Sequence, residues 1–239
     1  MTRPITTLTF FRYADLSAKL WAFGMMQFAH QHLTKVKGQT FYRLMGSGKG
    51  LGFNPWPDWS TYALIQSWTG EEEALAFFDH SKLMERYNER TEERCTVFMI
   101  STKAHGTWSG QSPFIKPEGL QIESLYTAVL TRAVIRTSKL ITFWSYVPTA
   151  QRPIEGATGL LFTKGVGEVP FKNMATFSIW ETETDMMAYA YQSAEHKKAI
   201  QMTRELDWYS EEMFSRFSPY AIEGDWGGGA LVPALARKR

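Results

Sequence analysis

The sequence predicts an α+β protein made of two tandem ferredoxin-like halves, each with the order β-α-β-β-α-β. Three observations lead to this fold class. Strand-like and helix-like segments alternate in the same order twice, LIQSW ending at Trp68 is matched by TFSIW ending at Trp180, and a stretch rich in Gly, Pro and Ser separates the two copies. We therefore expect an N-terminal half at 1–104, a linker at 105–124 and a C-terminal half at 125–239.

The first copy opens with ITTLTFFRY, which reads as a strand, and continues with a helical stretch over 17–36. In that stretch Leu20, Phe23, Met26 and Phe28 recur near helical spacing. The remaining elements predicted for this half are strands at 40–48 and 60–68, a helix at 71–93 and a closing strand at 95–101.

The second copy repeats the order with a strand at 126–135, a helix at 138–150, strands at 158–168 and 174–180, and a helix beginning near Asp185. Each half also has a predicted capping box before its second helix. Thr69 with Glu72 forms it in the first half, and Thr182 with Asp185 forms it in the second.

The segment GSGKGLGF at 46–53 raises the question of a phosphate-binding loop. It falls where the second copy has KGVGEVPF, between two strands, so a hairpin with positive φ angles is the simpler interpretation. A Walker loop needs Lys followed by Ser or Thr, whereas Gly50 follows Lys49. The prolines that come next also oppose the helix that a dinucleotide loop requires. We expect a turn that lines a binding site.

Composition narrows the class of function. The formal charge is +2 with basic and acidic residues interspersed, which argues against nucleic-acid binding. Cys95 is the only cysteine, so an intrachain disulfide or a Cys-built metal site is excluded and a reducing cytoplasm fits. No apolar stretch reaches the roughly 18 residues of a membrane span, so we expect a soluble or at most membrane-peripheral protein. The aromatic share of 15% suits an apolar cavity, a core or an interface.

Histidines are the candidate ligands. His30 and His32 read as a polar helix end, and His105 lies in the predicted linker. His80 and His196 each occupy the second helix of their half. The face of His196 carries Ala199, Ile200 and Thr203, and that of His80 carries Leu83, Met84 and Tyr87. Either face could lie against a flat apolar cofactor such as haem, or could simply be part of a core. Spacing alone decides neither between these two roles nor between the two histidines. Tyr189 and Met187 are lesser alternatives.

Several phrases, in order along nearly the whole chain, resemble the spheroidene monooxygenase family of acyclic carotenoid 2-ketolases. They are LWAFGMMQ, GSGKGLGFNPWP, HGTWSGQSPF, KGVGEVP with TFSIW, EHKKAIQMTRELDW with YSEEMFSRF, and GDWGG. The resemblance implies oxygenation of a carotenoid at C-2 with O2 and a donor such as ferredoxin. It also implies haem b and a dimeric α/β-barrel architecture related to chlorite dismutases and dye-decolourising peroxidases.

In those relatives the proximal histidine comes from a C-terminal helix, which favours His196 as the iron ligand, with Ala199 and Ile200 beside the cofactor. A distal cation would stabilise developing negative charge on bound oxygen, and Lys164 and Arg136 are the candidates. Phe53 and Trp56 of the hairpin region are expected to line the substrate tunnel. We also expect a small apolar substrate and a homo-oligomeric protein.

Two other interpretations remain open. A haem dehydratase or peroxidase on the same scaffold would act without a reductase. A cofactor-free binding or dimerisation protein would use the aromatic residues at an interface and would be colourless.

Overall fold

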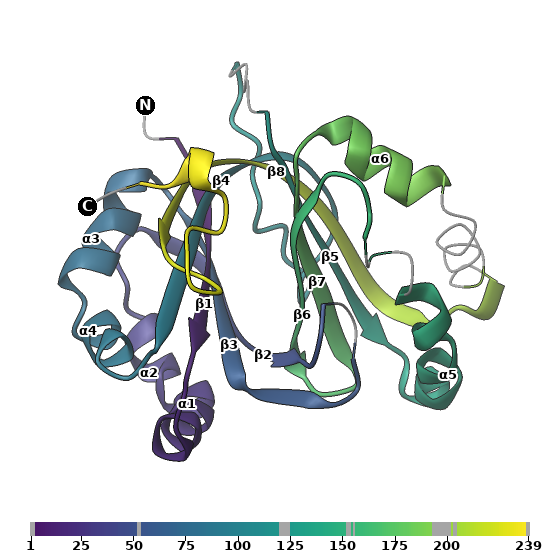
Figure 1. Ribbon diagram of the computed structural model, residues 1–239, viewed down its shortest axis with the longest axis horizontal. Coiled ribbons are helices and arrows are strands. Elements are labelled where there is room, and N and C mark those ends of the chain that lie inside the picture. Colours follow the sequence, from purple (N-terminus) through teal and green to yellow (C-terminus); the bar gives the residue numbers. More distant parts are fainter. Residues whose placement is uncertain are drawn as a thin grey trace.

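A computed structural model describes residues 3–51, 54–119, 125–151, 154, 156–192, 202 and 205–237. The predicted α+β class is confirmed, because eight strands close into one antiparallel barrel with helices on its outside (Figure 1). The strand order around the barrel is β1-β3-β2-β6-β7-β5-β8-β4. The two halves therefore join edge to edge, through β2 with β6 and β4 with β8.

The N-terminal half contributes four strands and four helices. In chain order they are β1 (Ile5–Arg12), α1 (Leu16–Phe28), α2 (His30–Leu33), β2 (Gln39–Gly48), β3 (Pro57–Trp68), α3 (Glu71–His80), α4 (Lys82–Asn88) and β4 (Glu93–Gly106). The single helix expected over 17–36 is divided at Ala29, and β4 runs two residues into the segment predicted as linker.

The C-terminal half contributes β5 (Thr127–Ile135), η1 (Thr137–Lys139), α5 (Leu140–Gln151), β6 (Leu160–Val169), β7 (Asn173–Trp180), α6 (Glu183–Gln192), β8 (Tyr209–Gly224) and η3 (Pro233–Leu235). Strand, helix, strand, strand, helix and strand thus follow one another twice along the chain, while all eight strands belong to the same barrel. Whether each half is ferredoxin-like in its own right stays a prediction.

The glycine-rich hairpin is confirmed as the connection between β2 and β3. Gly48 pairs with Pro57, the Lys49 N–H donates to the Trp56 carbonyl at 2.9 Å, and Gly50 has a φ of 75°. Positive φ is the conformation for which glycine is needed in a tight turn. The segment therefore reverses the chain and opens no helix, which agrees with the sequence argument against a dinucleotide loop.

The two predicted capping boxes have opposite outcomes. The capping box predicted at Thr182 is confirmed, because Thr182 Oγ1 accepts the Asp185 N–H at 3.0 Å at the start of α6. The prediction of a capping box at Thr69 is wrong. The Thr69 N–H is taken by the Gly38 carbonyl at 2.8 Å, so α3 starts one residue later with Gly70 as its N-cap and no side-chain cap.

The barrel is filled, not hollow. One buried cluster draws residues from all eight strands, including Leu8 on β1, Met45 on β2 and Phe177 on β7, which places it inside. The N-terminal helices bury a second, continuous cluster against the outer face of their strands. On the C-terminal side the corresponding face carries two separate, smaller clusters. As far as the described residues go, the two halves thus differ in how their outer faces are covered.

Candidate functional site

Two places on the C-terminal half bear on function: a charged network inside the barrel and a partly open outer face beneath α5 and α6. The network centres on Arg132, whose side chain is only 2% exposed. Arg132 follows the interior residue Leu130 by two positions on β5, so it points inward. Its guanidinium binds Glu168 at 3.2 Å and Glu211 at 2.7 Å.

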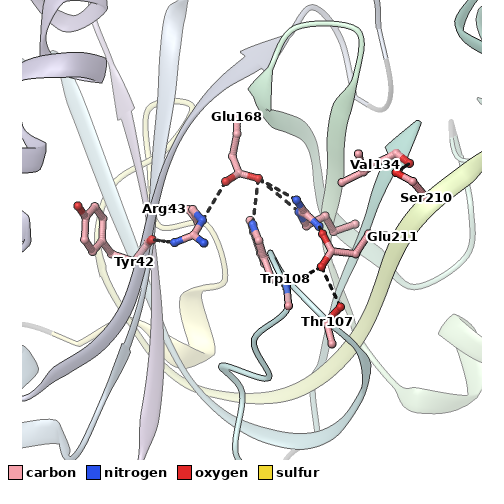
Figure 2. Close-up of polar contacts among 10 residues, drawn as sticks. Tyr42, Arg43, Thr107, Trp108, Val134, Glu168, Ser210 and Glu211 are labelled. Carbon is pink, nitrogen blue, oxygen red and sulfur yellow. Dashed lines mark hydrogen bonds and ion pairs between the residues drawn. The ribbon is translucent and has the colours of Figure 1, made fainter. Parts of the chain in front are cut away.

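Each carboxylate of the network has further partners. Glu168 accepts Arg43 Nε at 2.9 Å and Trp108 Nε1 at 2.9 Å. Glu211 accepts the Thr107 hydroxyl at 2.8 Å and the Gly110 N–H at 2.9 Å. Two arginines face two carboxylates, so the formal charges balance and the oxygens are occupied. The arrangement ties the segment after β4 to the barrel (Figure 2).

The electrostatics of Glu211 follow from this bonding. Burial opposes ionisation, but hydrogen bonds from the Gly110 N–H, the Arg132 guanidinium and the Thr107 hydroxyl outweigh it and lower the Glu211 pKa to about 2. A carboxylate held ionised in this way is a poor proton donor near neutral pH. The network therefore serves to fix structure, and sequence spacing gave no signal for it because its members come from five distant segments.

Lys164, predicted as a catalytic cation, lies on β6 opposite the interior residue Phe177 and faces the inside of the barrel. Its Nζ is 3.0 Å from Asp58 Oδ2. Burial opposes ionisation of Asp58, but hydrogen bonds from Ser60 and Lys164 outweigh it and lower the Asp58 pKa. The catalytic role of Lys164 stays a prediction, and its ion pair inside the barrel argues for a structural task.

The other predicted site residues are dispersed. Arg136 follows β5, is exposed and pairs with Asp207 at 3.1 Å. Trp56 stands at the hairpin before β3 and is 68% exposed. The remaining predicted residues, Phe53, His196, Ala199 and Ile200, lie outside the described residues, so their roles stay predictions.

The other histidines have ordinary surroundings. His80 ends α3 and is exposed, and His105 is exposed on β4. His30 Nδ1 lies 3.0 Å from the Tyr42 hydroxyl. Among the described residues no group of three or more His, Cys, Asp or Glu side chains is arranged to hold a metal ion. A haem iron needs one protein ligand, so such a group is not required for haem.

The outer face of the C-terminal strands has features expected of a ligand site. Thr131, in the middle of β5, is exposed although both its neighbours along the strand are buried. Beside it the face carries Thr176 on β7 and Gly165 on β6, which pair with each other. The hydroxyls of Thr163 and Thr176 are buried and have no hydrogen-bond partner among the residues that the structure describes. Small side chains with unsatisfied buried donors leave room and polar anchors for a bound group.

Apolar walls flank this face on both sides. One wall, packed under α5, contains Phe143, Met174 and Trp208. The other, under α6, contains Trp180 and Met186 with Tyr189 against them. Figure 1 shows α5 and α6 on the same side of the barrel, at opposite ends of these strands.

Arg216 of β8 is a residue that sequence reasoning missed. It pairs with Val129 on the neighbouring strand β5, a member of the wall under α6, and so lies on the outer face. Its guanidinium binds Glu183 and lies 3.5 Å from the Met187 sulfur, both on α6. Its Nε is buried and has no hydrogen-bond partner within the described part of the chain. Among the described arginines on the outer face, Arg216 is thus the one closest in strand register to Thr131. Arg136 lies beyond the end of β5.

The fold defines a structural class: an α+β protein built on one closed antiparallel barrel of eight strands. No family model matches the chain. The likeness to an aldoxime dehydratase, with a TM-score of 0.60, 8% identity and coverage of 90% of this chain and 81% of that one, concerns the fold alone. A putative monooxygenase from Fusobacterium nucleatum has a TM-score of 0.41, with 96% of this chain and 97% of that one covered at 9% identity.

Sequence relatives identify the family. Spheroidene monooxygenase of Rhodobacter capsulatus is 34% identical over 227 residues, covering 94% of both chains. The proteins of the same name from Cereibacter sphaeroides and Rubrivivax gelatinosus are 33% and 35% identical and cover 93% and 89% of this chain, and 68% and 81% of their own lengths. The chain belongs to the spheroidene monooxygenase family, as its resemblance predicted, and is an oxidoreductase of the monooxygenase type. No described helix is long and apolar enough to cross a membrane.

Proposed function

We propose that the protein is a haem-dependent monooxygenase that oxygenates an acyclic carotenoid at C-2, using O2 and electrons from a donor such as ferredoxin. The observation that carries the proposal is the family relationship, which extends over nearly the whole of both chains in the Rhodobacter capsulatus comparison. Haem would supply O2 activation with external electrons, the chemistry that such a reaction needs.

The outer face of the C-terminal strands fits haem in shape and polarity. A flat apolar ring needs a surface of small side chains, which Thr131, Gly165 and Thr176 provide. Phe143 on one side and Trp180 on the other would exclude water from its edges. The hydroxyls of Thr163 and Thr176 would find acceptors there, and Arg216 would place a positive charge beside an anionic edge.

The names of the relatives and the apolar walls support the proposed substrate class. A carotenoid end is a long hydrocarbon, so its binding depends on burial of apolar area and on few polar contacts. Phe53 and Trp56 stay the predicted tunnel residues. His196 stays the predicted iron ligand, with Ala199 and Ile200 beside the cofactor.

An absorption spectrum tests the cofactor. Protein expressed with ample haem supply is expected to show a Soret band that shifts on reduction and on addition of CO. His196→Ala is expected to abolish the band, and the matched His80→Ala variant is expected to retain it, since His80 is exposed at the end of α3. Loss in His80→Ala with retention in His196→Ala would reverse the ligand assignment. A colourless wild-type protein that cannot take up added haem would overturn the haem proposal.

The position of the cofactor has its own test. Thr131 is exposed, so Thr131→Trp adds a large ring over the outer face without overpacking the interior. We expect this variant to lose haem, while Thr40→Trp, at an exposed position of β2, keeps it. Equal haem content in the two variants would exclude the outer face. Turnover that depends on a ferredoxin system would separate the monooxygenase from a peroxidase or dehydratase on this scaffold.

A further inference from the structure

Helix α1 has its apolar residues on an unexpected side. Its buried face consists of Ala18, Ala22 and Met25, which pack on the barrel. The opposite face carries Leu16, Leu20 and Phe23, which recur at helical spacing. Their side chains are 72%, 63% and 56% exposed. A surface helix of a globular protein normally has the reverse arrangement, with large apolar residues inside and polar ones outside.

This face continues onto the barrel. The ring of Trp59 on β3 is 54% exposed and lies 5.5 Å from the ring of Phe23. Leu16, Leu20, Phe23 and Trp59 are called the α1 apolar face below. The β2–β3 hairpin, which carries the exposed Trp56, extends along the same lower edge of the barrel in Figure 1. A contiguous apolar surface of this kind marks an interaction site.

The charge around the α1 apolar face indicates what covers it. No Asp or Glu stands between Asp15 and Asp58, whereas the same stretch carries Lys35, Lys37 and Lys49 on its exposed surface. Asp15 itself is engaged as the N-cap of α1, accepting the Ala18 N–H. The segment of chain that carries the α1 apolar face is therefore basic in a chain whose net charge is only +2.

We propose that the α1 apolar face docks on the surface of an anionic lipid membrane. An apolar strip with aromatic rings and flanking lysines is the arrangement by which helices lie in the membrane interface, since the apolar side chains enter the acyl boundary and the lysines meet lipid phosphates. A second copy of the chain fits less well, because a symmetric contact places the same patch on both sides and brings lysines against lysines with no acidic residue from this stretch to offset them.

The docking surface goes beyond the proposed function and does not depend on haem, since it lies on the N-terminal half. Its experiment measures binding to vesicles, independent of turnover. Purified full-length protein is mixed with vesicles of phosphatidylcholine alone or of phosphatidylcholine with phosphatidylglycerol, and the bound fraction is measured by flotation. We expect binding to the anionic vesicles, with the affinity falling as salt concentration rises.

Double variants test whether the α1 apolar face is the surface that binds the vesicles. Leu20→Ser with Phe23→Ser is expected to weaken binding about tenfold or more, because two apolar side chains no longer leave water. The matched control, Ile115→Ser with Ile141→Ser, alters side chains that are 65% and 90% exposed elsewhere and is expected to bind as the wild type does. Lys35→Gln with Lys37→Gln is expected to weaken binding to anionic vesicles by roughly fivefold per lysine.

A labelled cysteine shows directly which face enters the lipid. Cys95 is buried, so a thiol probe added to Phe23→Cys reports on α1, and the same probe on Ile141→Cys reports on α5. When anionic vesicles are added, we expect the emission of an environment-sensitive dye to shift to the blue at position 23 and to stay unchanged at position 141. Absence of vesicle binding, equal binding of the Leu20→Ser/Phe23→Ser variant, or a shift only at position 141 overturns the proposal. So does a wild-type dimer that the same variant converts to monomer while vesicles have no effect, which would assign the face to a second copy.

Discussion

Replacement of Arg132 by methionine tests whether the barrel interior depends on its charged network. Arg132 is 2% exposed and binds Glu168 and Glu211, so Arg132→Met leaves both carboxylates inside the barrel with one cation fewer. Methionine has a similar length and fills most of the space, so the effect reports mainly on charge.

The expected loss follows from what each carboxylate retains. Removal of one partner from a buried ion pair costs about 3–5 kcal/mol. Glu168 keeps Arg43 and Trp108, and Glu211 keeps Thr107 and Gly110, which places the expected loss at the lower end, about 3 kcal/mol. Arg43→Met is the matched comparison. Arg43 is 25% exposed and has one carboxylate partner, so its loss should be about 1 kcal/mol.

The pH dependence provides the second readout. The folded-state Glu211 pKa of about 2 lies below the ordinary value of 4.5, so its contribution to stability is complete above about pH 5 and is lost as the pH falls toward 2. In Arg132→Met the pKa rises toward the ordinary value, and the variant should lose less stability than the wild type over that interval. The assay is urea unfolding from pH 7 to pH 3. A loss below about 1 kcal/mol at pH 7, with an unchanged acid slope, would refute the reasoning.

Three further predictions concern single positions. Gly106 has a φ of 84°, and a Cβ there would lie 2.1 Å from a backbone oxygen, so Gly106→Ala should cost more than about 2 kcal/mol in urea unfolding, against about 1 kcal/mol for Gly110→Ala, where nothing lies within 4 Å. Thr182→Ala removes the cap of α6 and should cost about 1 kcal/mol by the same measurement. Lys164→Met should keep kcat within about threefold while lowering stability, because Lys164 faces the interior; a loss of tenfold or more in kcat would restore its catalytic assignment.

Local patterns in the sequence predicted most of the elements. The strand β1, the hairpin glycines and the Thr182 cap depend on neighbours within a few residues, and each has the structure expected of it. The strand β8 was not recognised. It contains Pro219 and its pairing with β4 is irregular in two places, so its alternation is interrupted.

The candidate sites depend on contacts that no local pattern contains. Arg132, Glu168 and Glu211 meet only because β5, β6 and β8 enter the same barrel. Helical spacing in α1 was recognised correctly, but spacing does not tell which side faces the barrel. The small Ala18 and Ala22 lie inside and Leu20 outside, the reverse of the arrangement that is usual for a surface helix.

The unequal outer faces of the two halves suggest a division of tasks within the repeat. The N-terminal helices bury one continuous core and turn Leu20 and Phe23 outward, whereas the C-terminal strands leave Thr131 open beneath α5 and α6. Docking and oxygenation should therefore be separable. The Leu20→Ser/Phe23→Ser variant should keep its Soret band and its rate on carotenoid dissolved in detergent, and lose rate on carotenoid held in anionic vesicles. An equal fall on both forms of substrate would mean that the α1 apolar face belongs to the catalytic machinery, since delivery from the membrane affects only the second.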